Sequence, residues 1–125
     1  MLEYLEFEKL KGKTLVKVDV DKDGYEVTFR TDDGEIYILY HDQDCCESVT
    51  VDDICGDIDD LIGSPLVEAE EVTSSENPEG VEKKNQDSFT WTFYKLGTAK
   101  GSVTIRWYGQ SNGYYSESVY FKRAA

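Results

Sequence analysis

Three successive segments in the first third of the chain alternate apolar and polar residues, and this pattern limits how the chain can fold. The segments are TLVKVDV (14–20), YEVTFRT (25–31) and EIYILYH (35–41). A period of two residues is typical of a β-strand that buries one of its faces. Short turn sequences at 21–24 and 32–34 separate the segments. We therefore expect an antiparallel meander over residues 14–41.

The first of these turns also opens like the calcium loop of an EF-hand, with Asp19, Asp21 and Asp23 ahead of Gly24. Such a loop needs a glutamate at its twelfth position to complete the coordination shell. That position holds Arg30, and both flanks have the period of a strand rather than of a helix. We expect a hairpin turn without calcium, in which Gly24 supplies a positive φ angle.

The spacing of apolar residues changes in SVTVDDICGDIDDLIGSP, where they recur at helical intervals: Val51, Ile54, Ile58, Leu61 and Ile62. Thr50 stands before two aspartates as an N-cap residue would, and Gly63 and Pro65 provide a stop. The pattern predicts one principal α-helix at about 50–62. Gly56 inside that helix costs about 1 kcal/mol relative to alanine unless something packs closely there.

The second half of the chain predicts a further set of strands. They are PLVEAEEV (65–72), SFTWTFYKL (88–96), SVTIRWYG (102–109) and GYYSESVYF (113–121). The Asn112-Gly113 pair is a strong hairpin signal between the last two. The polar segment 73–87 is predicted to be a mobile loop. Together these features predict a single α+β domain over 1–125, with two antiparallel meanders (14–41 and 88–121) and one principal helix.

The net charge of −13 comes from 26 acidic and 13 basic residues. It argues against binding to a nucleic acid backbone or to an anionic membrane surface. No apolar run approaches the 18 residues of a membrane span. Three cysteines, two of them adjacent, form no disulfide framework and indicate a reducing, intracellular setting.

The densest group of possible ligands or catalytic side chains is HDQDCCE (41–47). Adjacent cysteines rarely direct both sulfurs to one metal, and no paired CxxC element or nucleophile elbow is present. We interpret these cysteines as small buried thiols at a corner between two elements. We therefore expect no metal, no cofactor and no catalytic residues.

A binding function has better support, because cationic, amide and aromatic side chains recur in the last strands. Phe89 and Trp91 share one face of their strand, and Arg106 lies opposite the apolar row of the next, as Arg30 does in its own strand. Arginine binds phosphate through two donors, and aromatic rings stack on bases. Two further candidates for contacts to a small nucleotide are Asn112 and Tyr115. Surface ion pairs and a well-packed aromatic hairpin are the structural alternatives.

Two stretches, HDQDCCESVTVDDICGDIDDLIGSPLVEAEE (41–71) and DSFTWTFYKLGTAKGSVTIRWYGQSNGYYSESV (87–119), resemble a domain common in bacteriophage and prophage genomes. We associate this domain with the Thoeris anti-defence proteins of the first type, and RWYGQSNGYYS is the most specific part of the resemblance. The resemblance implies a non-enzymatic sponge in the cytoplasm of an infected bacterium. Such a sponge sequesters a cyclic ADP-ribose isomer made by a TIR-domain enzyme.

The resemblance also implies an assembly and a site. Family members look like homo-oligomers with nucleotide pockets at protomer interfaces, and some also hold cyclic oligonucleotides. The matching arginines for phosphate are Arg30 and Arg106. On chemical grounds, Phe89 or Trp91 would be the aromatic platform, and Asn112 with Tyr115 the polar contacts.

Two other functions stay open from the sequence. The first is an acidic interaction protein that mimics the charge of DNA and blocks a host defence or DNA-binding protein. The second is a hydrolase that acts on the same cyclic signal. Recovery of intact ligand from the protein separates sequestration from hydrolysis, and salt-sensitive binding to a basic protein identifies mimicry.

Overall fold

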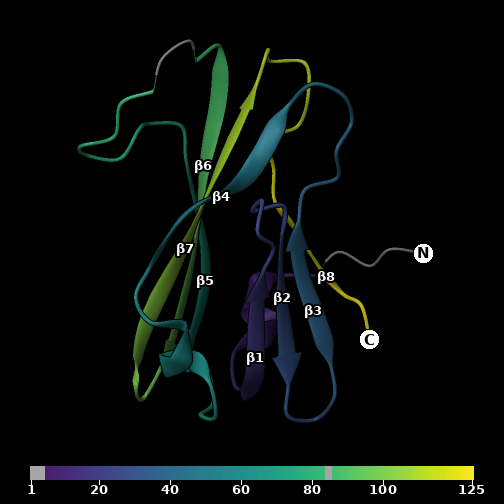
Figure 1. Cartoon of the computed structure of the whole chain (residues 1–125), viewed down its shortest axis with the longest axis vertical. Helices are drawn as coiled ribbons and strands as arrows, with labels where there is room; N and C mark the ends of the chain where they lie inside the picture. The colour runs from purple at the N-terminus through teal and green to yellow at the C-terminus, as the bar shows by residue number, and fades with distance from the viewer. Residues whose placement is uncertain (1–4, 84–85) are drawn as a thin grey trace.

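The computed structural model describes residues 5–83 and 86–125, which form two antiparallel β-sheets of four strands each (Figure 1). The strand order is β1-β2-β3-β8 in the first sheet and β4-β7-β6-β5 in the second. The first sheet consists of β1 (Leu15–Val20), β2 (Glu26–Thr31), β3 (Ile36–Tyr40) and β8 (Tyr120–Arg123). The second consists of β4 (Ser48–Cys55), β5 (Glu68–Ser74), β6 (Ser88–Thr98) and β7 (Gly101–Ser111).

The predicted first meander is confirmed. Strands β1, β2 and β3 pair in sequence, each antiparallel to the last. The turn between β1 and β2 places Gly24 at φ 77°, and its carbonyl accepts a 2.8 Å hydrogen bond from the backbone N–H of Val51 in β4. The aspartate-rich segment is therefore a turn that docks against the second sheet.

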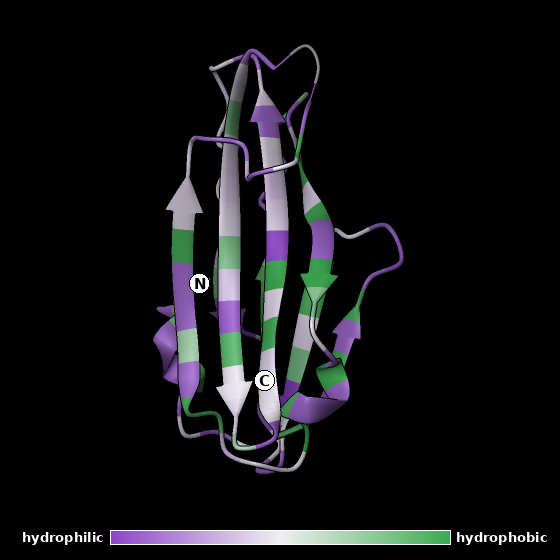
Figure 2. Cartoon of the chain, turned by 90° about the vertical axis from the view of Figure 1, so that its left-hand side faces the viewer, coloured by the Kyte–Doolittle hydropathy of each residue, from purple (hydrophilic) through white to green (hydrophobic). Residues whose placement is uncertain are grey.

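The two sheets bury their inner faces against each other in one hydrophobic core. Phe7, in the short 3₁₀ turn η1 (Phe7–Leu10), lies between them. Its ring centre is 4.7 Å from that of Tyr94 in the second sheet. On the first sheet, its ring centre is 6.1 Å from that of Phe29 and 5.3 Å from that of Phe121. The alternating colours along the strands in Figure 2 reflect the two-residue period that divides each strand between core and solvent.

The predicted principal helix at 50–62 is wrong. Residues Ser48–Cys55 form β4, and only the 3₁₀ turn η2 (Ile58–Leu61) is helical in this stretch. A shift of register between Val51 and Asp53 marks a β-bulge. The extra residue leaves Val51 and Ile54 on the same face, opposite Trp107 and Ile105, although they are three positions apart. A bulged strand therefore gives the apolar spacing of a helix.

Gly56 directly after β4 explains why the chain turns here. Its φ is 109°, a value that L-residues rarely adopt. A Cβ atom at this position would lie 2.5 Å from the carbonyl oxygen of Ser102 and 3.1 Å from the Cα of Val103. The close packing that would justify a glycine is therefore present, but at the end of a strand rather than inside a helix.

The predicted last hairpin is also wrong. Strand β7 ends at Ser111, and the chain then crosses to the other sheet, where β8 pairs with β3. Gly113 has a positive φ of 95°, so Asn112-Gly113 does form a turn. No residue of 112–119 belongs to a strand. The second meander is instead β5-β6-β7, with β4 added at its edge.

The cysteines differ from the expectation. Cys45 and Cys46 are exposed and joined by a disulfide between adjacent residues, and Cys55 is exposed with a free thiol. The expectation of buried thiols is therefore wrong, and the cysteines no longer support a reducing setting. Within 5–83 and 86–125, none of the helices has the length and apolar character that crossing a bilayer requires.

We expect replacement of Gly56 by alanine to lower the free energy of unfolding by about 3 kcal/mol, because the new Cβ adds a backbone clash to an unfavourable φ. Urea unfolding of the purified variant measures this loss. Gly34→Ala is the matched control, since Gly34 also has a positive φ (86°) but nothing lies within 4 Å of its Cβ position. Equal losses in the two variants would contradict the close approach at Ser102.

Candidate functional site

Strands β6 and β7 carry aromatic and cationic side chains on the face turned away from the core. In their register Trp91 lies opposite Tyr108 and Phe93 opposite Arg106, so all four project from the same face. The other face carries core residues that include Tyr94, Ile105 and Trp107. Three predicted site residues, Phe89, Trp91 and Arg106, thus share the outer face of the second sheet, which Figure 2 turns toward the viewer.

Trp91 is fully covered although it lies on this outer face. The guanidinium carbon of Arg106 is 5.1 Å from the centre of its ring, and the ring centre of Tyr108 is 4.5 Å away. The indole N–H donates a 3.0 Å hydrogen bond to the side-chain oxygen of Asn77. Because Trp91 has no exposed surface, the half-buried ring of Phe89 is the predicted stacking ring that remains accessible.

The described part of the polar segment 73–87 packs on these rings. Lys83 places its ammonium 5.0 Å from the centre of the Tyr108 ring. The side-chain nitrogen of Gln86 donates to the hydroxyl of Tyr108 at 2.6 Å and to Asn77 at 3.1 Å. The segment therefore covers the centre of the sheet, and residues 84–85 lie outside the described residues. We call Phe89, Trp91, Arg106, Tyr108 and Lys83 the Trp91 cluster.

Asp52 pairs with both cations of the Trp91 cluster. One of its carboxylate oxygens accepts hydrogen bonds from Nη2 and Nε of Arg106 at 2.6 and 3.0 Å, and the other lies 3.4 Å from the ammonium of Lys83. The bulge in β4 lies at this residue. An anionic ligand that binds Arg106 must therefore compete with Asp52.

The second predicted arginine lies elsewhere. Arg30 is exposed in β2, between Lys17 of β1 and Ile36 of β3. Its neighbours in the strand, Phe29 and Thr31, are buried, so Arg30 points to the outer face of the first sheet. The core separates the two sheets, so Arg30 and Arg106 face away from each other within one protomer.

Asn112 and Tyr115 lie in the crossover after β7. The side-chain oxygen of Asn112 accepts the backbone N–H of Tyr114 at 3.0 Å, so this amide stabilises the turn. Tyr115 is half-buried. The crossover is held to the second sheet by Glu117, whose carboxylate accepts hydrogen bonds from Thr90 at 2.8 Å and from Ser111 at 2.5 Å.

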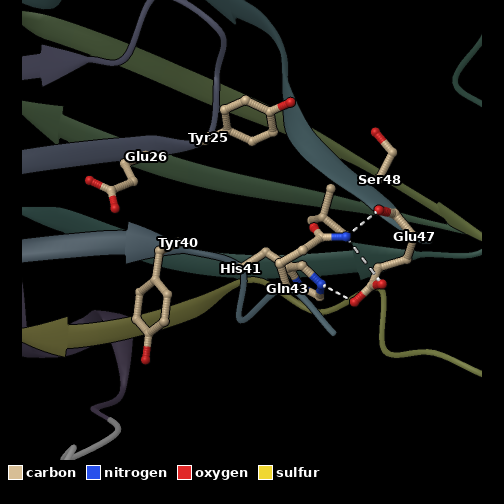
Figure 3. Close-up of a pocket in the computed structure, with 8 residues that line it drawn as sticks. Tyr25, Glu26, Tyr40, His41, Gln43, Glu47 and Ser48 are labelled. Atoms are coloured by element: carbon tan, nitrogen blue, oxygen red, sulfur yellow. Dashed lines mark hydrogen bonds and ion pairs between the residues drawn. The ribbon is translucent and has the colours of Figure 1, made fainter. Parts of the chain in front are cut away.

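A separate pocket of about 460 Å³ opens beside the start of β4 (Figure 3). It was not predicted from the sequence, because its walls come from three separate parts of the chain. The lining residues are Tyr25, Glu26, Tyr40, His41, Gln43, Glu47, Ser48 and Val49. We call it the Glu47 pocket.

Glu47 is a buried carboxylate whose oxygens are both hydrogen-bonded. Oε2 accepts from Nε2 of His41 at 2.8 Å and from the backbone N–H of Asp44 at 2.9 Å. Oε1 accepts from the backbone N–H of Cys45 at 2.9 Å and from the side chain of Gln43 at 3.2 Å. The hydrogen bond from His41, with the backbone donors, lowers the pKa of Glu47 to about 2 although burial opposes the shift.

His41 extends this arrangement to the crossover. Its Nδ1 lies 2.6 Å from the carbonyl oxygen of Ser118, which can only accept a hydrogen bond. Its Nε2 lies 2.8 Å from the carboxylate of Glu47, so the ring links the two segments. The pair connects the end of β3 to the start of β4 and to the segment before β8. The segment HDQDCCE therefore stabilises the fold at this position. Within the described residues, no three His, Cys, Asp or Glu side chains form a metal site.

We expect Glu47 to make folding stability depend on acid pH. Because its folded-state pKa lies below the ordinary value of 4.5, its contribution is complete above about pH 4.5 and is lost as the pH falls toward 2. In Glu47→Gln the free energy of unfolding should be lower at pH 7, and its difference from the natural protein should shrink below pH 4.5. Urea unfolding from pH 7 to 2.5 measures both curves.

The exposed Asp42 provides the control for this experiment, because Asp42→Asn removes a nearby carboxylate that accepts none of these hydrogen bonds. That variant should follow the natural protein across the pH range. A constant gap between Glu47→Gln and the natural protein from pH 7 to 2.5 would contradict an ionised, hydrogen-bonded Glu47.

Comparison with known proteins places most of the chain in one family. Residues 8–121 match a family described as "Domain of unknown function (DUF7448)". No curated protein and no solved structure matches the chain.

Proposed function

The chain belongs to the DUF7448 family, and we propose that it binds a small cyclic nucleotide signal and sequesters it without cleaving it. The ligand we propose is a cyclic ADP-ribose isomer, and cyclic oligonucleotides belong to the same chemical class. A phage that made such a protein in the cytoplasm of its host would withdraw the signal from a Thoeris immune effector. The proposal rests on the resemblance of 41–71 and 87–119 to anti-defence domains and on the chemistry of the Trp91 cluster.

The observation that carries the proposal is the position of Arg106. Its guanidinium lies 5.1 Å from the centre of the Trp91 ring, on the face that also holds Phe89, Tyr108 and the ammonium of Lys83. Two cations beside aromatic rings suit the phosphate and the base of a nucleotide. On a chain of net charge −13, such a local group of donors determines anion binding more than distant carboxylates do, because salt screens the latter.

Asp52 determines how strongly an anionic ligand must bind Arg106 in order to displace it. Its carboxylate accepts the hydrogen bonds of Arg106 that a bound phosphate would otherwise accept. The pyrophosphate of a cyclic ADP-ribose isomer carries two negative charges on neighbouring phosphates, against one on Asp52, and can bind the guanidinium through two oxygens. Sequestration needs tight binding and slow release rather than a general base.

A pocket that uses both predicted arginines requires two protomers, because Arg30 and Arg106 face opposite sides of one protomer. We propose that a homo-oligomer supplies Arg30 from one protomer and Arg106 from its partner. An interface pocket of this kind also encloses a ligand more completely than an open sheet face.

We expect Arg106→Ala to weaken binding of a cyclic ADP-ribose isomer by about 1.5–3 kcal/mol, the range for a charged hydrogen bond. Asp52→Asn should change affinity in the opposite direction, strengthening binding by about 1 kcal/mol, because it removes the internal competitor for the guanidinium. Calorimetric titration measures both, and chromatography of the heat-released ligand tests that it is intact. No change in either folded variant would exclude Arg106 from the site, and release of a cleaved product would indicate a hydrolase.

We expect Arg30→Ala and Arg106→Ala to complement each other if the pocket spans two protomers. When the two variants are unfolded, mixed in equal amounts and refolded, about a quarter of the pockets in a two-fold dimer should hold both arginines again. The measured quantity is the number of high-affinity sites per chain. A mixture that binds no better than the separate variants would exclude a pocket with one arginine from each protomer.

A further inference from the structure

The side-chain nitrogen donors of the Glu47 pocket, on His41 and Gln43, are already used inside the protein. His41 directs one ring nitrogen to Glu47 and the other to the carbonyl of Ser118. The side-chain nitrogen of Gln43 donates to the backbone and side-chain oxygens of Glu47, at 2.7 and 3.2 Å. A ligand that needs hydrogen-bond donors from the protein therefore finds neither of these side chains free to donate.

The acceptors of the pocket remain open. Neither the carboxylate of Glu26 nor the hydroxyl of Ser48 makes a hydrogen bond or ion pair with any residue of 5–83 or 86–125. The amide oxygen of Gln43 likewise accepts no hydrogen bond from the described chain. In Figure 3 the carboxylate of Glu26 and the hydroxyl of Ser48 lie on opposite sides of Tyr25, and the amide of Gln43 points toward Glu47. Such a set of acceptors favours a ligand that is itself a donor.

The charge of the pocket also favours a donor ligand, in particular one that is a cation. Glu47 is paired with His41, whereas the carboxylate of Glu26 makes no ion pair with a described residue and supplies negative charge at the pocket. No lysine or arginine lines the pocket. A cation is therefore attracted both by Glu26 and by the overall charge of −13.

Two tyrosine rings complete the pocket. Tyr25 is 56% exposed at the tip of the β1–β2 turn, and that turn is fixed to β4 by the hydrogen bond between Gly24 and Val51. The ring of Tyr40 already has the ammonium of Lys122 at 4.6 Å from its centre, so this environment accommodates a cation beside an aromatic face. Cation–π contact and a carboxylate together are typical of sites for organic ammonium groups.

We propose that the Glu47 pocket binds a small organic ammonium compound with an apolar or aromatic body. The ammonium group of the ligand bonds to the carboxylate of Glu26, and its body packs beside Tyr25. The volume of about 460 Å³ lies within the range of small-molecule pockets. This site is separate from the Trp91 cluster and shares no residue with it, so the inference does not depend on nucleotide binding.

The test compares phenethylamine with 2-phenylethanol, which replaces the ammonium by a neutral hydroxyl on the same aromatic body. Amide chemical shifts of the full chain are followed by NMR during titration at about 150 mM salt, where distant charges are screened. Phenethylamine should bind at least about tenfold more tightly than the alcohol, with the largest shifts at Tyr25 and Glu26.

Matched variants then locate the charge that is responsible. Glu26→Gln should weaken phenethylamine binding by at least about fivefold, because it neutralises the carboxylate in the pocket. Glu70→Gln removes the same charge from an exposed position on β5 outside the pocket and should change affinity by less than about twofold. Both side chains are exposed, so both variants are expected to fold.

Three results would overturn the inference. The first is equal binding of the amine and the alcohol, and the second is equal weakening by Glu26→Gln and Glu70→Gln. The third is the absence of phenethylamine-induced shifts at the pocket. Tighter binding of the amine that depends on Glu26 and not on Glu70 would establish the site.

Discussion

Aromatic contacts of Phe7 connect the two sheets of the fold. Its ring packs on Tyr94 of the second sheet and on Phe29 and Phe121 of the first. Each sheet is amphipathic and is stable only when its apolar face is buried against another layer. An aromatic residue from outside both sheets fills the space between them. Alternation along each strand places Arg30 and Arg106 opposite the buried residues, so the two arginines lie on opposite outer faces.

The second sheet carries polar groups that a simple sandwich does not need. Trp91 lies on the outer face and is covered by the chain's own polar segment, whose Asn77 binds the indole N–H. Asp52 then neutralises Arg106 beside it. An aromatic residue on an outer face exposes apolar surface unless something covers it, and here a loop does so. The Trp91 cluster, which the proposed nucleotide site requires, is thus also a packed part of the fold.

The Glu47 pocket shows how a structural carboxylate can define a site. Burial of a charged group is costly unless every oxygen finds a donor, and Glu47 recruits donors from His41, Gln43 and two backbone amides. Those donors are then lost to any ligand. The groups that face the opening are therefore acceptors and tyrosine rings, whereas the nitrogen donors bond to Glu47. The kind of ligand that such a site favours is thus set by the hydrogen-bonding groups that the folded protein leaves unused.

Regular alternation of apolar and polar residues was enough to predict the meander of residues 14–41 and the long strands around Trp91 and Arg106. It also indicated that Arg106 lies opposite the core-facing row, because a strand has a fixed period of two. The folded structure was needed to identify 48–55 as a strand, since the bulge near Asp52 gives the apolar spacing of a helix. It alone decided that β8 joins the first sheet, and that Trp91 is covered while Arg30 and Arg106 point apart. Pairing between distant strands and contacts between loops and sheets depend on the whole chain, and a local pattern carries no information about them.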